Sequence, residues 1–201
     1  MSSDSNSVLD AIATRRSTRQ FANAPVSQSD LQAILQAGSQ APSAGNRQPW
    51  RFFLVQNHTV RNSVSAAMLH ALEAQQLETS HELTKAEASS VYHSARAIEQ
   101  APVLVLVYSP LRSSQSGGSY ALSDLQSSGA CMQNMALAAH SLGISSLWIC
   151  DVTYVAQRIN ELVDVRNHQL VAAMALGYTS PDADGYVAPR RSLTNSFLGS
   201  M

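Results

Sequence analysis

The chain of 201 residues has few charged side chains and almost no lysine: charged residues make up 13%, and Lys85 is the only lysine. Its formal net charge is −1 at pH 7, so no overall field attracts a nucleic acid or a membrane surface. Because 45% of the residues are hydrophobic, much of the surface must consist of small polar residues or be covered by another subunit. We expect neither a nucleic-acid nor a membrane partner.

Cysteine is equally scarce. Cys131 and Cys150 are too few for a disulfide framework, and they do not have the spacing of a metal site. Both lie in apolar stretches, which predicts that both belong to the core. The histidines are scattered and form no H-E-x-x-H pattern, so no metal site is expected. The sequence also shows no evident pairing of a nucleophile with a general base.

Long apolar runs are missing too, and no stretch approaches the length of a membrane span. Residues 1–7 are polar, lack the apolar core of a secretory signal, and are expected to be disordered. We therefore expect a cytoplasmic protein. The length suits one domain over residues 1–201.

Helical and strand-like patterns alternate along the chain. The sequence predicts helices at about residues 8–16, 28–38, 121–142 and 154–163, and a long helical region at 59–99 with a possible break at 79–88. It predicts strands at 51–56, 103–108, 145–149 and 170–176. This pattern favours an α+β fold with a central mixed sheet of about four or five strands flanked by helices.

An arginine-rich segment follows the first predicted helix. Arg15, Arg16, Ser17 and Arg19 offer guanidinium groups and a hydroxyl, which together suit a phosphate. The alternative is a solvated charge cluster at a helix C-terminus, where cations also complement the helix dipole.

A second polar segment lies just before the first predicted strand. It begins with turn-forming and small residues, Pro42 and Ser43, and carries the amides of Asn46 and Gln48. It ends at Pro49-Trp50 and a buried apolar run. A loop of this kind suits a planar polar ligand, although it also reads as a surface loop followed by an aromatic anchor.

The two segments together resemble the opening of the nitroreductase family. The pattern R-R-S-x-R-x-F is followed, after an intervening helix, by A-P-S-x-x-N-x-Q-P-W-x-F. The resemblance implies a homodimeric FMN-dependent oxidoreductase. In such an enzyme NADH or NADPH reduces the flavin, and a small-molecule acceptor such as a nitroaromatic or a quinone then reoxidises it by ping-pong kinetics.

The resemblance also implies which residues hold FMN. The phosphate falls to Arg15, Arg16, Ser17 and Arg19, with Arg190 or Arg191 from the end of the chain. The amides of Asn46 and Gln48 would meet the ribityl chain and ring edges, Pro42 and Ser43 would pass along the ring, and Leu147, Trp148 and Ile149 would close its back. No side chain is assigned a catalytic role, because the flavin carries the chemistry. Two alternatives remain: a flavoenzyme of the same fold with other chemistry (flavin fragmentation, dehalogenation or azoline oxidation), and a non-catalytic flavin-binding protein.

Overall fold

The computed structural model describes residues 8–79, 82–111, 118–185 and 187–192. Residues 1–7, for which we expected disorder, lie outside the described residues. The elements in chain order are α1 (Val8–Thr14), α2 (Gln28–Ser39), η1 (Ala44–Asn46), β1 (Arg51–Val55), α3 (His58–Glu73), α4 (Lys85–Gln100), β2 (Val103–Pro110), α5 (Gly118–Ser141), β3 (Ser145–Ile149), η3 (Asp151–Val155), α6 (Ala156–Val163) and β4 (His168–Gly177).

The predicted α+β fold is confirmed, with four strands in the order β1-β2-β4-β3. We expected a mixed sheet, but all three strand pairings in the described part of the chain are antiparallel. The connections explain the difference. The two helices α3 and α4 return the chain to the end at which β1 stopped, so β2 runs back beside β1. The single helix α5 makes β3 parallel to β2, but β4 lies between them.

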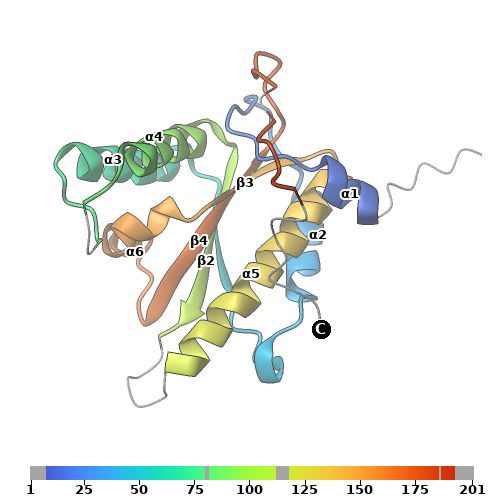
Figure 1. Cartoon of the computed structure of the whole chain (residues 1–201), viewed down its shortest axis with the longest axis horizontal. Coiled ribbons are helices and arrows are strands. Elements are labelled where there is room, and N and C mark those ends of the chain that lie inside the picture. Colours follow the sequence, from blue (N-terminus) through green and yellow to red (C-terminus); the bar gives the residue numbers. More distant parts are fainter. Residues whose placement is uncertain (1–7, 80–81, 112–117, 186, 193–201) are drawn as a thin grey trace, which may run out of the picture.

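Helices cover both faces of this sheet (Figure 1). Helices α3, α4 and α6 pack on one face around residues such as Val64, Met68 and Ile98. Helices α2 and α5 pack on the other face, around residues such as Ile34 and Met135. Strand β2 is buried along almost its whole length, as its run of apolar residues predicts.

The helix boundaries follow from local capping. Ser27 accepts a hydrogen bond from the backbone N–H of Asp30 and so begins α2 where the sequence predicts. A break interrupts the helical region predicted at 59–99, but it lies between Glu73, where α3 ends, and Lys85, rather than at 79–88. A capping box of Thr84 and Glu87 begins α4. Gly143 follows α5 with φ = 73°, in the left-handed region that glycine favours.

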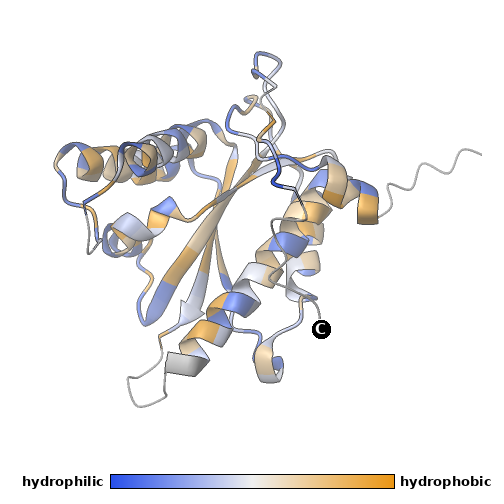
Figure 2. Ribbon diagram, viewed as in Figure 1, coloured by the Kyte–Doolittle hydropathy of each residue, from blue (hydrophilic) through white to orange (hydrophobic). Residues whose placement is uncertain are grey.

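The predicted burial of Cys150 is wrong, and the apolar face of α1 is exposed in the single chain. Val8, Leu9 and Ile12 form the apolar face of α1 (orange in Figure 2), yet their exposed fractions are 71%, 76% and 52%. Cys131 is buried as expected, whereas Cys150 is exposed because it lies just beyond the end of β3. An apolar sequence context therefore did not guarantee a place in the core at these positions.

Candidate functional site

The arginine-rich segment runs between β3 and the chain that follows β4. Ser17 forms a parallel bridge with Ser146, and the backbone N–H of Thr18 donates to the carbonyl of Ser146 at 3.0 Å. Phe21 is buried and forms an antiparallel bridge with Thr179. The segment is thus attached on both sides, and Arg15 and Arg19 project from a fixed backbone.

The sequence-distant arginines meet at this place. Burial lowers the pKa of Arg15, and the positive charges of Arg190 and Arg16 lower it further. Among the described residues neither Arg15 nor Arg190 forms an ion pair. Arg190 is thus near enough to Arg15 for the two positive charges to repel, although they lie far apart in the sequence. An anion with several oxygens would offset that cost.

Arg16 behaves differently from its neighbour. Its Nη1 donates to the carbonyl oxygens of Ala13 and Arg15, at 2.6 and 2.8 Å. These carbonyls lie at the C-terminal end of α1, where they have no partner within the helix. The guanidinium of Arg16 thus ends the helix, which is the structural role that we kept open for this cluster.

The Pro42–Gln48 segment adopts an unusual backbone. Gly45, Asn46 and Gln48 have φ values of 58°, 54° and 47°. Such left-handed conformations cost free energy in residues with a side chain, and they persist only where their surroundings fix them. Here the Oγ of Ser43 accepts from the backbone N–H of Gln48 at 3.0 Å, and the Nε2 of Gln48 donates to the Oδ1 of Asn46 at 3.0 Å. The two predicted amide side chains are therefore held together, while Pro42 is exposed beside them.

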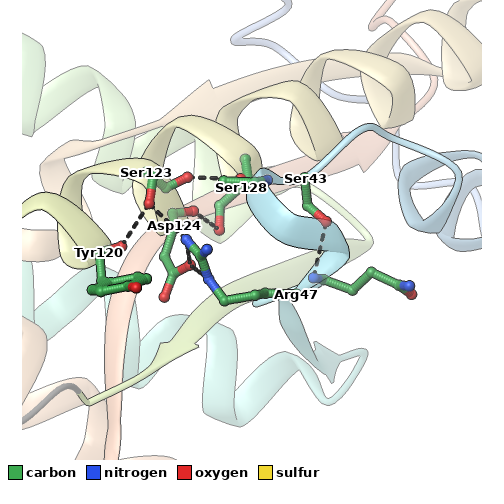
Figure 3. Close-up of polar contacts among 9 residues, drawn as sticks. Ser43, Arg47, Tyr120, Ser123, Asp124 and Ser128 are labelled. Atoms are coloured by element: carbon green, nitrogen blue, oxygen red, sulfur yellow. Dashed lines mark hydrogen bonds and ion pairs between the residues drawn. The ribbon is translucent and has the colours of Figure 1, made fainter. Parts of the chain in front are cut away.

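Sequence reasoning missed what holds this loop to the protein (Figure 3). The backbone N–H of Ala44 donates to the Oγ of Ser127 on α5, at 3.2 Å. The guanidinium of Arg47 lies 2.9 Å from the Oδ1 of Asp124 on the same helix, and the exposed fraction of that carboxylate is only 2%. A signal was present, since Asp124 is the only acidic residue of α5 and a lone acid in an apolar helix requires a partner.

The two predicted binding segments do not meet in the single chain. At one end of α5, the Oγ1 of Thr14 lies 2.8 Å from the Nε2 of His140 and so places the arginine-rich segment. Further toward the N-terminus of α5, Ser127 holds the loop. His140 lies thirteen positions after Ser127, which is about 20 Å along a helix. The arginine-rich segment and the loop with the two amides thus contact different parts of α5.

The end of β3 lies between these two places. Leu147 and Ile149 are buried in the core that faces α3, α4 and α6, so at most their backbone groups are available to a ligand. Trp148 points to the other face, with an exposed fraction of 37%. Its ring packs near Gly129 of α5, where an added Cβ would lie 3.5 Å from the indole Cη2. Of the three residues predicted here, only Trp148 offers a side chain.

The neighbouring Cys150 does not provide a reactive thiolate. Partial burial of its thiol raises the pKa of Cys150, and the nearby carboxylate of Asp151 raises it further. That carboxylate accepts hydrogen bonds from Ser90 at 2.9 Å and Ser94 at 2.5 Å, which tie η3 to α4. A protonated thiol is a poor nucleophile and a poor metal ligand at neutral pH.

Two other features bear on what can bind. A cavity of about 640 Å³ lies between α6 and the start of β4, and none of the predicted site residues lines it. Within the described ranges no group of three or more His, Cys, Asp or Glu side chains is arranged to hold a metal ion. No helix in the same ranges is long and apolar enough to cross a membrane.

Comparison with known proteins relates the chain to flavoproteins. The sequence profile of the nitroreductase family matches residues 12–178. A protein of Archaeoglobus fulgidus, provisionally described as an NADH dehydrogenase/NAD(P)H nitroreductase, is 28% identical over 187 residues, which are 91% of each chain.

Solved structures show the same relationship. A provisionally assigned nitroreductase of Desulfovibrio desulfuricans in complex with FMN is 27% identical and superposes with a TM-score of 0.72, with 98% of each chain covered. A nitroreductase of Bacteroides fragilis with bound FMN is 25% identical, with a TM-score of 0.71 and coverage of 98% of this chain and 99% of that one.

Proposed function

Since the chain belongs to the nitroreductase family, we propose that it is an FMN-dependent oxidoreductase that passes electrons from NADH or NADPH to a small-molecule acceptor. FMN would supply the redox chemistry when bound, because its ring takes up a hydride from the nicotinamide and gives two electrons to the acceptor. The protein then needs to bind, orient and shield the reactants.

The uncompensated charge at Arg15 and Arg190 is the observation that carries this proposal. Neither guanidinium has an acidic partner in the described chain; burial lowers the pKa of Arg15, and the charges of Arg190 and Arg16 lower it further. A phosphate monoester carries between one and two negative charges at neutral pH and accepts several hydrogen bonds. The phosphate of FMN therefore fits the charge and the donors that the chain presents. The same observation favours Arg190 over Arg191 as the C-terminal contributor.

The ring of FMN requires different groups, and these lie on the loop at Pro42–Gln48. The amides of Asn46 and Gln48 suit the polar edges of the ring, Pro42 and Ser43 suit its face, and the exposed side of Trp148 offers an aromatic surface. Because the loop and the arginine cluster lie on different parts of α5, we propose that two subunits complete each site, with the loop of one subunit facing the arginine cluster of the other.

A homodimer would also account for the uncovered apolar residues. Helix α1, with its exposed Val8, Leu9 and Ile12, packs against α5, which carries the exposed Leu122 and is followed directly by the exposed Leu142. Apolar groups at this density favour burial against a second chain. A dimer formed through α1 and α5 would bury them and bring two sites together at the contact.

An anaerobic absorbance experiment tests the function. We expect the purified protein to be yellow or to become yellow with FMN, to lose its 450 nm-region absorbance with NADH or NADPH, and to recover it with a nitroaromatic or a quinone. Steady-state rates should then show the parallel-line pattern of a ping-pong mechanism. Protein that stays colourless in excess FMN would refute the proposal. Bound flavin that neither nucleotide reduces would indicate a non-catalytic binding protein, and analysis of flavin and acceptor products would reveal other chemistry.

A further inference from the structure

Arg47 lies between the two amide residues that the proposed function assigns to the flavin ring, but its own guanidinium points away to α5 (Figure 3). Its Nε donates to the Oδ1 of Asp124 at 2.9 Å, and its Nη2 donates to the Oγ of Ser123 at 2.6 Å. The Cζ of the guanidinium also lies over the Tyr120 ring, 5.1 Å from its centre. These contacts direct the head group of Arg47 toward α5.

The partner of Arg47 makes this contact hard to replace. The exposed fraction of Asp124 is 1%, and a buried carboxylate is tolerated only when it is paired and hydrogen-bonded. The helix supports the same place, since the Oγ of Ser127 donates to the carbonyl of Ser123 at 2.6 Å and accepts from the backbone N–H of Ala44. The loop is thus docked on α5 at two points, Ala44 and Arg47.

This docking acts on a backbone that would not hold its shape alone. Asn46 and Gln48, on either side of Arg47, both have positive φ. A chain released from α5 would relax toward commoner conformations and turn both amides away from their present positions. The hydrogen bond between the Gln48 and Asn46 side chains then would not survive, because it depends on both backbone conformations.

We infer that Arg47 is a positioning residue: through its pair with Asp124 it fixes the loop in the left-handed conformation that presents Asn46 and Gln48 to the flavin ring. This inference rests on the proposed function for the identity of the ligand. The docking itself is a property of the flavin-free protein, and it can be measured separately.

The first measurement is amide hydrogen exchange over residues 43–48 of the flavin-free protein. In the wild type, the backbone N–H groups of Ala44, Asn46, Arg47 and Gln48 are hydrogen-bonded, so we expect protection. Arg47→Met keeps most of the side-chain stem and removes the charge and donors, and should raise exchange in this segment. Arg166→Met is the matched control, since Arg166 forms an exposed ion pair with Asp164, and it should leave exchange at 43–48 unchanged.

The second measurement reports on the flavin ring. We expect Arg47→Met to weaken FMN binding by about tenfold, the equivalent of one hydrogen bond to a charged or polar group, and to change the visible circular dichroism and the reduction potential of bound flavin. A role limited to overall stability would leave the dichroism and potential of the bound flavin as in the wild type. If Arg47→Met does not fold, Arg47→Lys can be used instead. The lysine keeps a positive charge beside the Asp124 carboxylate, but it cannot also contact Ser123 and the Tyr120 ring. The visible circular dichroism and the reduction potential of flavin bound to Arg47→Lys should then lie between those of wild-type-bound and free FMN.

The outcomes separate the two proposals. Unchanged exchange at 43–48 in Arg47→Met, or raised exchange with unaltered flavin affinity, dichroism and potential, would overturn the inference. A wild-type protein that binds no FMN would overturn the proposed function and the flavin part of this inference, while the exchange data would still decide whether Arg47 fixes the loop.

Discussion

The arginines near the two ends of α5 differ in whether a carboxylate pairs with them. Near the N-terminal end, Arg47 is paired with the buried carboxylate of Asp124. At the C-terminal end, Arg15 lies near Arg190 and Arg16, and in the described part of the chain neither Arg15 nor Arg190 has a carboxylate partner. A cation paired with a buried acid belongs to the folded architecture, whereas cations gathered without acids suit an anionic ligand.

This difference matters because arginine is almost the only cation of the chain. Residue type alone therefore cannot separate a structural arginine from a binding arginine here. Arg16 shows the point within a single segment, since it ends α1 by donating to two carbonyls, although its neighbour Arg15 belongs to the uncompensated cluster. Substitutions at the two ends of α5 should consequently affect different quantities.

The largest effect is expected at the paired end. Arg47→Ala leaves the buried carboxylate of Asp124 without its ion-pair partner and should lower the free energy of unfolding by about 3 kcal/mol, measured by urea denaturation of the flavin-free protein. The control Arg166→Ala removes an exposed pair and should cost less than about 0.5 kcal/mol. An equal, small loss in both variants would contradict the assignment of Arg47 to the folded architecture.

Near the C-terminal end of α5, where Arg15 lacks a carboxylate partner among the described residues, a substitution should lower ligand affinity rather than stability. Arg15→Ala should weaken FMN binding by about 1.5–3 kcal/mol, because one hydrogen-bonded charge on the phosphate is lost. It should not destabilise the flavin-free protein, since burial and two neighbouring cations already disfavour the charge of Arg15. Titration with FMN and with riboflavin separates the phosphate from the ring: riboflavin affinity should be unchanged. If FMN affinity is unaffected, Arg15 does not hold the phosphate.

Low pH should weaken the contact between the arginines and the FMN phosphate, because it protonates the phosphate. The second pKa of a phosphate monoester is about 6, so FMN loses one negative charge as the pH falls through that value, while the arginines stay charged. We expect FMN binding to weaken by roughly 1 kcal/mol between pH 7.5 and 5, and riboflavin binding to show no such change. Parallel pH profiles for the two flavins would argue against a phosphate at the arginine cluster.

The smallest effect is expected for a substitution of Arg16, which can be compared directly with its neighbour Arg15. Arg16→Ala removes the donors that end α1 and should lower the free energy of unfolding by about 0.3–1 kcal/mol. FMN affinity should fall less than in Arg15→Ala. Calorimetry and flavin titration of the two variants side by side test this ordering, and a larger loss of FMN affinity at Arg16 would reverse the roles that the structure suggests for the pair.

Local patterns predicted most elements of the fold. The structural basis is local: Ser27 caps α2 and Gly143 follows α5 in the left-handed region, and each acts within a few residues. The apolar run at 103–108 likewise predicted a buried central strand. The antiparallel sheet was not predicted, because strand direction depends on how many helices return the chain between strands.

Some features of the candidate site could likewise be predicted from the sequence, and others depend on the tertiary structure. The residue types that suit a phosphate and a planar ring were visible in two short motifs. Their separation along α5 was not, and neither was the pairing of Arg47 with Asp124, since the partners are 77 positions apart in the sequence. The burial of Leu147 and Ile149 and the exposure of the apolar face of α1 also depend on the packing of distant elements.

The sequence by itself determined the chemical groups of this protein and the order in which they occur, because motifs, caps and hydrophobic periods are properties of neighbouring residues. Only the tertiary structure decided which arginine pairs with a buried acid and which has no carboxylate partner among the described residues. Charge compensation depends on distance in space, and the folded backbone, rather than sequence separation, sets that distance.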